Sequence, residues 1–191
     1  MATVATPMGA EPVNTLSASG SFTGKVRHIK IASGYGTAIF YGDFVKLVST
    51  GTVEKDTGTS SLTPVGVFVG CSYTDPSTSQ LTFNQQFPAS TAADDIMAYV
   101  VDDPNLVMQM QSSGVLSQTE LGNNIAVVQT AGSTSIGRSK NSLGDTGATT
   151  NTLPMRIIEF VDGPNSAVGD AFTDALVFFN VGHQYTNTTG V

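Results

Sequence analysis

The sequence has few of the residues on which most catalytic, metal-binding and nucleic-acid-binding sites depend. Its 191 residues include one cysteine, two histidines and no tryptophan, and charged residues make up only 12% of the chain. A single cysteine excludes an internal disulfide framework and a cysteine-rich zinc site. Eight Lys and Arg against fifteen Asp and Glu give a formal net charge of -7. A nucleic-acid partner is therefore not expected, because phosphate neutralisation needs clustered basic side chains.

Long apolar segments are also missing. The longest runs are about six or seven residues, against the roughly 20 that a helix needs to cross a bilayer, so no membrane partner is expected. The N-terminus lacks the basic and apolar regions of a secretory signal, and no export is expected. The chain does have 40% apolar residues, including ten Phe and five Tyr. That content is enough for a folded core, and the length predicts one main domain.

The apolar residues occur in runs with the length and spacing of β-strands. Turn residues separate the runs, at about the 8–12-residue spacing that is typical of sandwiches and barrels. The ten runs are 26–31, 38–41, 44–48, 65–73, 81–87, 96–101, 106–111, 125–129, 155–161 and 175–181. We predict an all-β fold, an antiparallel β-sandwich or β-barrel, with a jelly-roll-like arrangement among the options.

Little of the chain is left for helices. The Ser-x-x-Glu spacing of Ser117–Glu120 is a capping box, but Gly122 limits it to a short helix. Residues 166–176 offer one further turn. The Gly/Ser/Thr/Asn-rich tract at 132–152 predicts a long loop, either an interface or a mobile tip.

The composition at the two ends of the chain predicts extended arms around a core domain at 25–181. Residues 1–24 have few large apolar side chains, which predicts either an arm that lies on a neighbouring subunit or a disordered tail. Residues 182–191 form the second arm. The residues expected at interfaces with other subunits are Val4, Pro7, Pro12, Val13, Leu16, Phe22, His183 and Tyr185.

Two patterns resemble catalytic or nucleotide-binding motifs. Asp-Thr-Gly occurs at Asp56 and at Asp145, as in aspartic proteases, but neither triplet follows the buried apolar strand that such a site needs. Residues 132–139 match a P-loop except that Arg138 replaces the lysine, and the residues that follow are poor helix formers. We interpret both patterns as turns.

The remaining candidates for chemistry are also weak. His28 and His183 lack the partners of a triad or a zinc site, and Asp94-Asp95 and Asp102-Asp103 lack the alternating spacing of a calcium loop. Cys71 lies in an apolar run and is expected to be buried. The sequence therefore predicts no catalytic residue, no cofactor and no metal site.

One stretch resembles a known family. Residues 42–47 read Gly-Asp-Phe-Val-Lys-Leu, 51–53 read Gly-Thr-Val and 64–68 read Pro-Val-Gly-Val-Phe. This order resembles the Gly-Asp-x-Val-x-Leu, Gly-x-Val, Gly-Val pattern of β-barrel capsid decoration (cement) proteins of tailed bacteriophages. Residues 1–13, 98–104 and 183–190 are similar to segments of small structural proteins from phages of aquatic hosts.

The resemblance implies a non-enzymatic subunit of the virion. Such proteins sit on the capsid exterior after synthesis in the host cytoplasm, commonly as homotrimers, and tie neighbouring copies of the major capsid protein together. The expected partners are thus the major capsid protein and further copies of this chain. The alternatives are another virion subunit, such as a head fibre, tail or adaptor protein, and a carbohydrate-binding β-sandwich module.

Overall fold

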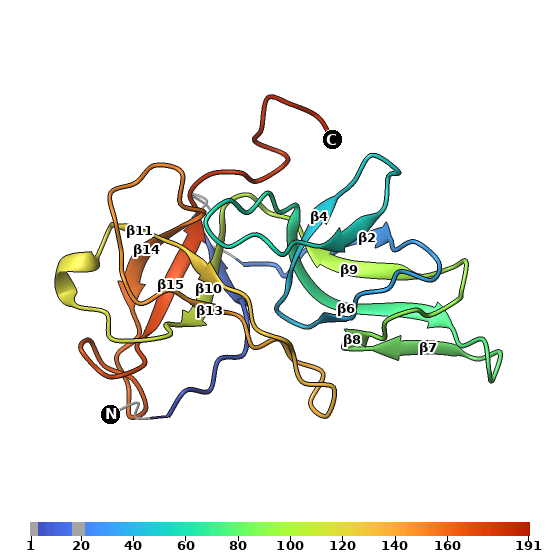
Figure 1. The fold of residues 1–191 in the computed structure, drawn as a ribbon, viewed down its shortest axis with the longest axis horizontal. Helices are drawn as coiled ribbons and strands as arrows, with labels where there is room; N and C mark the ends of the chain where they lie inside the picture. The colour runs from blue at the N-terminus through green and yellow to red at the C-terminus, as the bar shows by residue number, and fades with distance from the viewer. Residues whose placement is uncertain (1–3, 17–21) are drawn as a thin grey trace.

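The structure is a computed structural model that describes residues 4–16 and 22–191, and it is all-β (Figure 1). Every pair of strands in it is antiparallel. The two larger sheets are open at both ends, so the predicted sandwich, and not the barrel, is the arrangement seen. No helix in the described ranges is long and apolar enough to span a bilayer.

Two larger sheets lie side by side in Figure 1. The five-stranded sheet has the order β1 (Glu11–Thr15), β10 (Leu106–Gln111), β15 (Asp174–Phe179), β14 (Met155–Phe160), β11 (Asn124–Ile125). The six-stranded sheet has the order β2 (Arg27–Lys30), β9 (Met97–Val101), β6 (Gly66–Thr74), β4 (Phe44–Leu47), β5 (Val53–Lys55), with β7 (Leu81–Asn84) paired to β6. The small ribbons are β3 (Ile39–Phe40) with β8 (Gln86–Phe87), and β12 (Val127–Val128) with β13 (Ser142–Leu143).

Each of the ten predicted runs overlaps at least one strand. Strands β1, β5 and β13 were not predicted, because they are short or contain many polar residues. The short helix at Ser117–Glu120 is confirmed as a single 3-10 turn, in which the Ser117 N–H donates to the Glu120 carboxylate at 2.7 Å. Residues 166–176, the other place at which a helical turn was possible, form turns and bends that lead into β15.

The middle of the six-stranded sheet is buried on both faces. In β4, Phe44 faces the five-stranded sheet and the adjacent Val45 faces the opposite side; Val67 and Phe68 divide in the same way in β6. Successive side chains of a strand point to opposite faces, so a strand that is covered on both sides must be apolar throughout. This explains why the run at 65–73 is apolar apart from Ser72.

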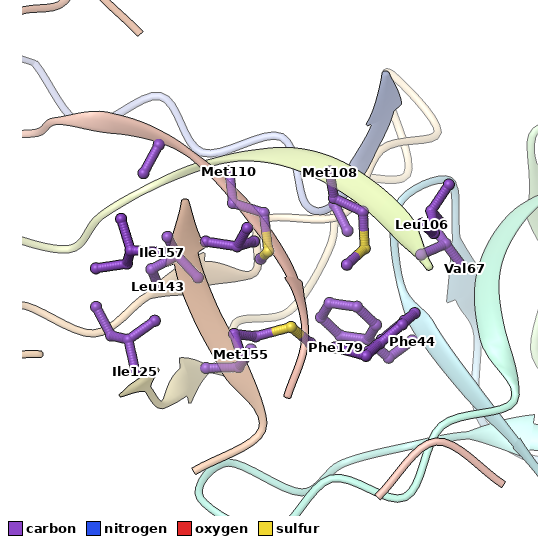
Figure 2. Close-up of a cluster of buried hydrophobic side chains, with 14 of the residues drawn as sticks. Phe44, Val67, Leu106, Met108, Met110, Ile125, Leu143, Met155, Ile157 and Phe179 are labelled. Carbon is purple, nitrogen blue, oxygen red and sulfur yellow. The ribbon is translucent and has the colours of Figure 1, made fainter. Parts of the chain in front are cut away.

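The first core fills the space between the two sheets (Figure 2). Met108 and Met110 reach it from β10 and Met155 from β14, and all three are almost fully buried. The rings of Phe44 and Phe179 meet edge to face there, with centroids 6.0 Å apart. Each such side chain stabilises the fold by about 1.5–3 kcal/mol. A second core lies under the β3–β8 ribbon, on the far face of the six-stranded sheet.

Part of the segment predicted as an N-terminal arm belongs to the fold. Residues 1–3 and 17–21 lie outside the described residues, but Glu11–Thr15 form edge strand β1 on β10. Ala10 is fully buried in the first core, and its N–H donates to the carbonyl of Gly42 at 2.9 Å. Gly9 has φ +78, and a Cβ on it would stand 2.6 Å from Gly42 and Ser139. This part of the chain is therefore closely packed against the sandwich.

The segments predicted as a loop at 132–152 and as a C-terminal arm also contact the fold. Ser139, Asn141 and the β13 residues are buried. The Gln184 side chain both accepts from the N–H of Leu47, at 2.6 Å, and donates to its carbonyl, at 2.9 Å. The 132–152 segment thus packs against the sandwich and the C-terminal segment against β4, and residues 185–191 are exposed.

Gly66 provides a test of the packing between β6 and β9. A Cβ on Gly66 would lie 2.2 Å from the carbonyl oxygen of Val101 on β9, whereas a Cβ on Gly36 would have no heavy atom within 4 Å. We expect Gly66→Ala to lower the free energy of unfolding by about 1–3 kcal/mol, as overpacked core substitutions do. Urea denaturation monitored by circular dichroism measures this change in the free energy of unfolding.

Gly36→Ala is the matched control. It should change the free energy of unfolding by no more than about 0.5 kcal/mol, because the new methyl group meets open space. Equal effects of the two substitutions would contradict the close approach of β6 to β9.

Candidate functional site

The N-terminal residues predicted to form interfaces lie at different depths. Val4, Val13 and Leu16 are exposed, at 67%, 38% and 45% of their surface. Pro7 and Pro12 are half-buried. Phe22 is partly buried and packs against the first core, so its ring contributes to the fold of its own chain. The exposed members of this group thus lie before β1 (Val4), within it (Val13) and directly after it (Leu16).

The two C-terminal residues predicted to form interfaces differ from each other. His183 is 2% exposed, and its ring lies between Phe179, at 5.1 Å, and Tyr185, at 5.6 Å between centroids. The rings on both sides of His183 belong to the same chain, and burial lowers the pKa of its imidazole. Tyr185 is 45% exposed, and the Arg27 guanidinium carbon lies 5.6 Å from its ring centroid. Tyr185 is therefore open to a partner and His183 is enclosed.

The Asp-Thr-Gly triplets occupy different environments. Asp56 is buried, and its carboxylate accepts hydrogen bonds from the N–H groups of Gly58, at 3.0 Å, and Thr63, at 2.7 Å. Asp145 is exposed. Two carboxylates in such different settings do not form a pair that shares a proton. The Asp56 side chain holds the loop after β5 in shape.

The segment that resembles a P-loop is a tight turn. The N–H of Ser133 donates to the carbonyl of Arg138 at 2.8 Å, and the N–H of Gly137 donates to Ser133 at 2.8 Å. The chain then enters β13 and no helix follows. The backbone donors that a phosphate would need at a helix N-terminus are absent from this segment.

The remaining polar candidates have internal partners. The Asp95 carboxylate accepts from the hydroxyl of Thr74 at 2.6 Å, and Asp102 forms an ion pair with Arg27. Within residues 4–16 and 22–191, no three His, Cys, Asp or Glu side chains are grouped so that they could hold a metal ion. Cys71 is buried as predicted, and burial raises the pKa of its thiol to about 12.

Strand β7 forms an exposed apolar edge that the sequence pattern did not identify. It pairs with β6 on one side, and no other strand of the described residues pairs with it (Figure 1). Leu81 and Phe83 share one face of β7 and are 61% and 69% exposed. The strand has no charged residue. Free edges are usually protected by charges, prolines or bulges, so an uncharged apolar edge is a candidate contact surface.

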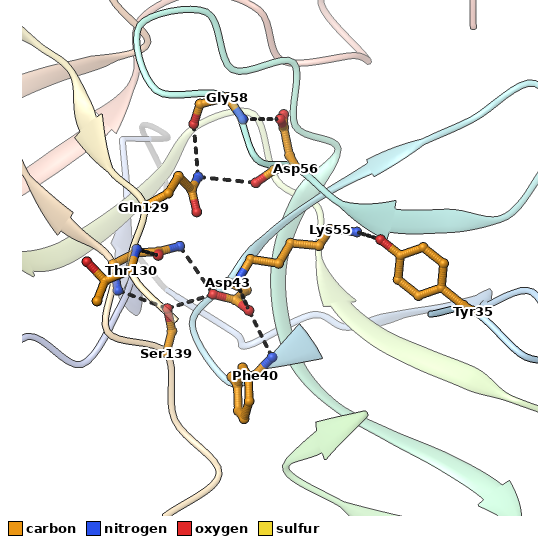
Figure 3. Close-up of polar contacts among 10 residues, drawn as sticks. Tyr35, Phe40, Asp43, Lys55, Asp56, Gly58, Gln129, Thr130 and Ser139 are labelled. Carbon is orange, nitrogen blue, oxygen red and sulfur yellow. Dashed lines mark hydrogen bonds and ion pairs between the residues drawn. The ribbon is translucent and has the colours of Figure 1, made fainter. Parts of the chain in front are cut away.

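A buried carboxylate, Asp43, joins three parts of the chain (Figure 3). Asp43 is 0% exposed and receives four hydrogen bonds. Its Oδ2 accepts from the Lys55 ammonium at 2.8 Å and from the N–H of Phe40 at 2.9 Å. Its Oδ1 accepts from the Ser139 hydroxyl at 2.6 Å and from the Asn141 amide at 3.2 Å. We refer to Asp43, Lys55, Ser139 and Asn141 as the Asp43 cluster.

A second set of hydrogen bonds runs beside the Asp43 cluster. The Gln129 amide donates to the carbonyls of Asp56, at 3.1 Å, and Gly58, at 2.9 Å. The N–H of Val127 donates to the carbonyl of Thr59 at 3.0 Å. The loop after β5 is thus joined to β12 and to the residue that follows it, close to Lys55, which ends β5.

Comparisons of this chain with protein-family models, with curated proteins and with solved structures found no match. The functional assignment therefore depends on the resemblance in sequence and on the geometry described above.

The buried imidazole of His183 predicts a pH dependence of stability. Its pKa is lower in the folded state than the ordinary value of 6.5. The unfolded chain therefore binds a proton here more readily, and the folded state loses stability as the pH falls below 6.5. We expect His183→Gln to reduce the difference in thermal midpoint between pH 7.5 and pH 5.5.

His28→Gln is the matched control for this measurement, because His28 is exposed on edge strand β2. It should leave the pH dependence unchanged. If the two variants had the same effect, His183 would not be the group responsible.

Proposed function

We propose that this chain is a capsid decoration protein, a cement subunit that binds the outside of a tailed-phage head and ties neighbouring major capsid proteins together. The resemblance of residues 42–47, 51–53 and 64–68 to the decoration-protein pattern supports this proposal. In the fold these residues belong to β4, the turn before β5, and β6. The resemblance therefore falls on the buried middle of the six-stranded sheet.

The observation that carries the proposal is the free edge of β7. A cement subunit must bind partners that it meets only on the assembled particle, and it must remain soluble before then. An edge strand offers unpaired backbone groups to a partner with little demand on sequence, and exposed apolar side chains add affinity. Strand β7, which carries the exposed Leu81 and Phe83, supplies both features and lies at one end of the molecule in Figure 1. Many copies on one lattice make individually weak contacts sufficient.

The proposal assigns the chain to a homotrimer on the capsid surface, with the major capsid protein as its second partner. The exposed Val13 and Leu16 of the N-terminal segment and Tyr185 near the C-terminus are further contact candidates. Among the described residues, β1 is the end strand of the five-stranded sheet, and it is a second position at which a partner strand would extend a sheet. Partners that add to β1 and β7 would extend both sheets.

A carbohydrate-binding module is the weaker alternative. A groove of about 510 Å³ lies along β10 and is lined by polar side chains such as Glu11, Gln109 and Asp174 together with two methionines. Ligand sites usually present aromatic faces among such groups. The nearby ring of Tyr41 is covered by Arg138, whose guanidinium carbon lies 4.7 Å from the centroid. The groove therefore offers no free aromatic surface.

The copy number in purified particles separates cement from other virion roles. We expect quantitative mass spectrometry to find this chain in numbers comparable to the major capsid protein. A number comparable to that of tail or neck proteins would instead support a fibre, tail or adaptor subunit, and absence from particles would contradict both.

The contact role of β7 can be tested with the double variant Leu81→Ser/Phe83→Ser. Both side chains are mostly exposed, so the thermal midpoint should stay close to that of the wild type. Binding to expanded phage heads, or self-association in sedimentation velocity, should weaken by about 10-fold or more, as expected when apolar anchors are removed from an interface.

Val115→Ser/Ile136→Ser is the matched control for β7. These two side chains are also large and exposed, at 52% and 57%, but they lie outside the strands. Their replacement should leave binding unchanged. Undiminished binding by the β7 variant would show that this edge is not the contact surface.

A further inference from the structure

The Asp43 cluster places an amine and a carboxamide on the two oxygens of one carboxylate. The Lys55 Nζ lies 2.8 Å from Oδ2 of Asp43, and the Asn141 Nδ2 lies 3.2 Å from Oδ1. Asp43 and Asn141 are 0% exposed, and the Lys55 side chain is 10% exposed. A potential nucleophile, an electrophilic carbonyl carbon and a group that can carry protons between them are thus held together away from solvent.

The other contacts of the cluster fit the demands of acyl transfer. When an amine attacks a carboxamide, negative charge develops on the carbonyl oxygen and needs a hydrogen-bond donor. The N–H of Thr130 donates to Oδ1 of Asn141 at 3.0 Å and so occupies that position. The Ser139 hydroxyl and the N–H of Phe40 hold the Asp43 carboxylate in place. Nucleophile, acid–base group and oxyanion donor are the three roles that such a reaction requires.

An aromatic ring lies near the amine. The ring centroid of Phe40 lies 6.0 Å from the Lys55 Nζ, and Phe40 itself is 6% exposed. This ring packs so closely on Gly132 that a Cβ there would lie 2.3 Å from it. Lysine amines act as nucleophiles in their neutral form, in sites from which water is largely excluded. The Phe40 ring thus shields the amine from bulk water.

We propose that Lys55 and Asn141 form an intramolecular amide bond, with Asp43 as the catalytic acid and base. Asp43 first takes a proton from the Lys55 ammonium, which leaves a neutral amine. The amine attacks Cγ of Asn141, the Nζ–Cγ bond forms, and the Cγ–Nδ2 bond breaks. Nζ gives up a second proton when the amide forms. That proton and the proton held by Asp43 are transferred to Nδ2, which leaves as ammonium. The carboxylate is regenerated, and no oxidant, metal or cofactor is consumed.

The bond would join two distant parts of the chain. Lys55 ends β5 at the edge of the six-stranded sheet, and Asn141 precedes β13, which pairs with β12. Asn141 lies in the tract that the sequence predicts to be a loop, and its full burial places it against the sandwich. A covalent tie within one chain does not require a capsid partner, so its test is independent of the proposed decoration role.

The test is the intact mass of the purified, folded wild-type chain. We expect a mass lower than that of the sequence by one molecule of ammonia. Tryptic digestion should yield one branched peptide that contains Lys55 and Asn141, since trypsin does not cleave after an acylated lysine. A wild-type chain that keeps its full mass after prolonged incubation at neutral pH would overturn the proposal.

Variants distinguish this bond from other losses of ammonia. Asparagine can also lose ammonia by forming a cyclic imide with its own backbone, and that reaction does not involve Lys55. Lys55→Met should therefore retain the full mass of its sequence. If Lys55→Met still loses ammonia, the proposal fails. Lys46→Met, on the neighbouring strand β4, is the matched control and should lose ammonia as the wild type does.

Two further substitutions test the roles within the cluster. Asp43→Asn removes the acid–base group at nearly constant volume and should abolish the mass loss; persistence of the loss would remove Asp43 from the mechanism. Asn141→Asp should lose water in place of ammonia and so reach the same final mass as the wild type. Full mass for Asn141→Asp in a folded chain would contradict attack at Cγ.

Discussion

The buried Asp43 carboxylate is the interaction on which the arrangement of the chain depends. An ionised carboxylate that is fully withdrawn from water is strongly unfavourable unless hydrogen bonds and an opposite charge compensate it. Here the compensation comes from the turn at Phe40, from β5 through Lys55, and from the 139–141 segment through Ser139 and Asn141. These segments must therefore meet whenever Asp43 is buried. The fold can close around this carboxylate only when all of them are in place.

The residues that follow Asp43 in the chain reach both hydrophobic cores. Phe44 and Val45, immediately after Asp43, point to opposite cores. The Asp43 carboxylate thus fixes the start of β4, and β4 determines which side chains enter each core. The N-terminal segment is tied to the same turn, because the N–H of Ala10 donates to Gly42. Several elements that are remote in sequence therefore share one anchor.

The Asp43 charge in the interior has partners within the chain, whereas one surface strand leaves apolar side chains exposed. The interior satisfies a charge with donors from distant segments, whereas β7 leaves apolar side chains and a sheet edge without a partner among the described residues. Both features suit a subunit that folds stably as a separate chain and then binds its partners on an assembled particle. The proposed decoration role uses the exposed edge, and the proposed Lys55–Asn141 bond would strengthen the interior.

The sequence by itself determined the fold class and most of the strands. Runs such as 65–73 and 96–101 are mostly apolar and rich in Val and Ile between turn residues, and those local preferences are sufficient to specify a strand. Burial of Cys71 and the short turn at Ser117 also followed from local patterns. Tertiary structure decided that Glu11–Thr15 is a strand, that Asn141 is buried, that His183 is enclosed and that Phe83 is exposed. The reason is physical: alternation along a strand shows that two faces differ, but only the packing of distant segments decides which face is covered.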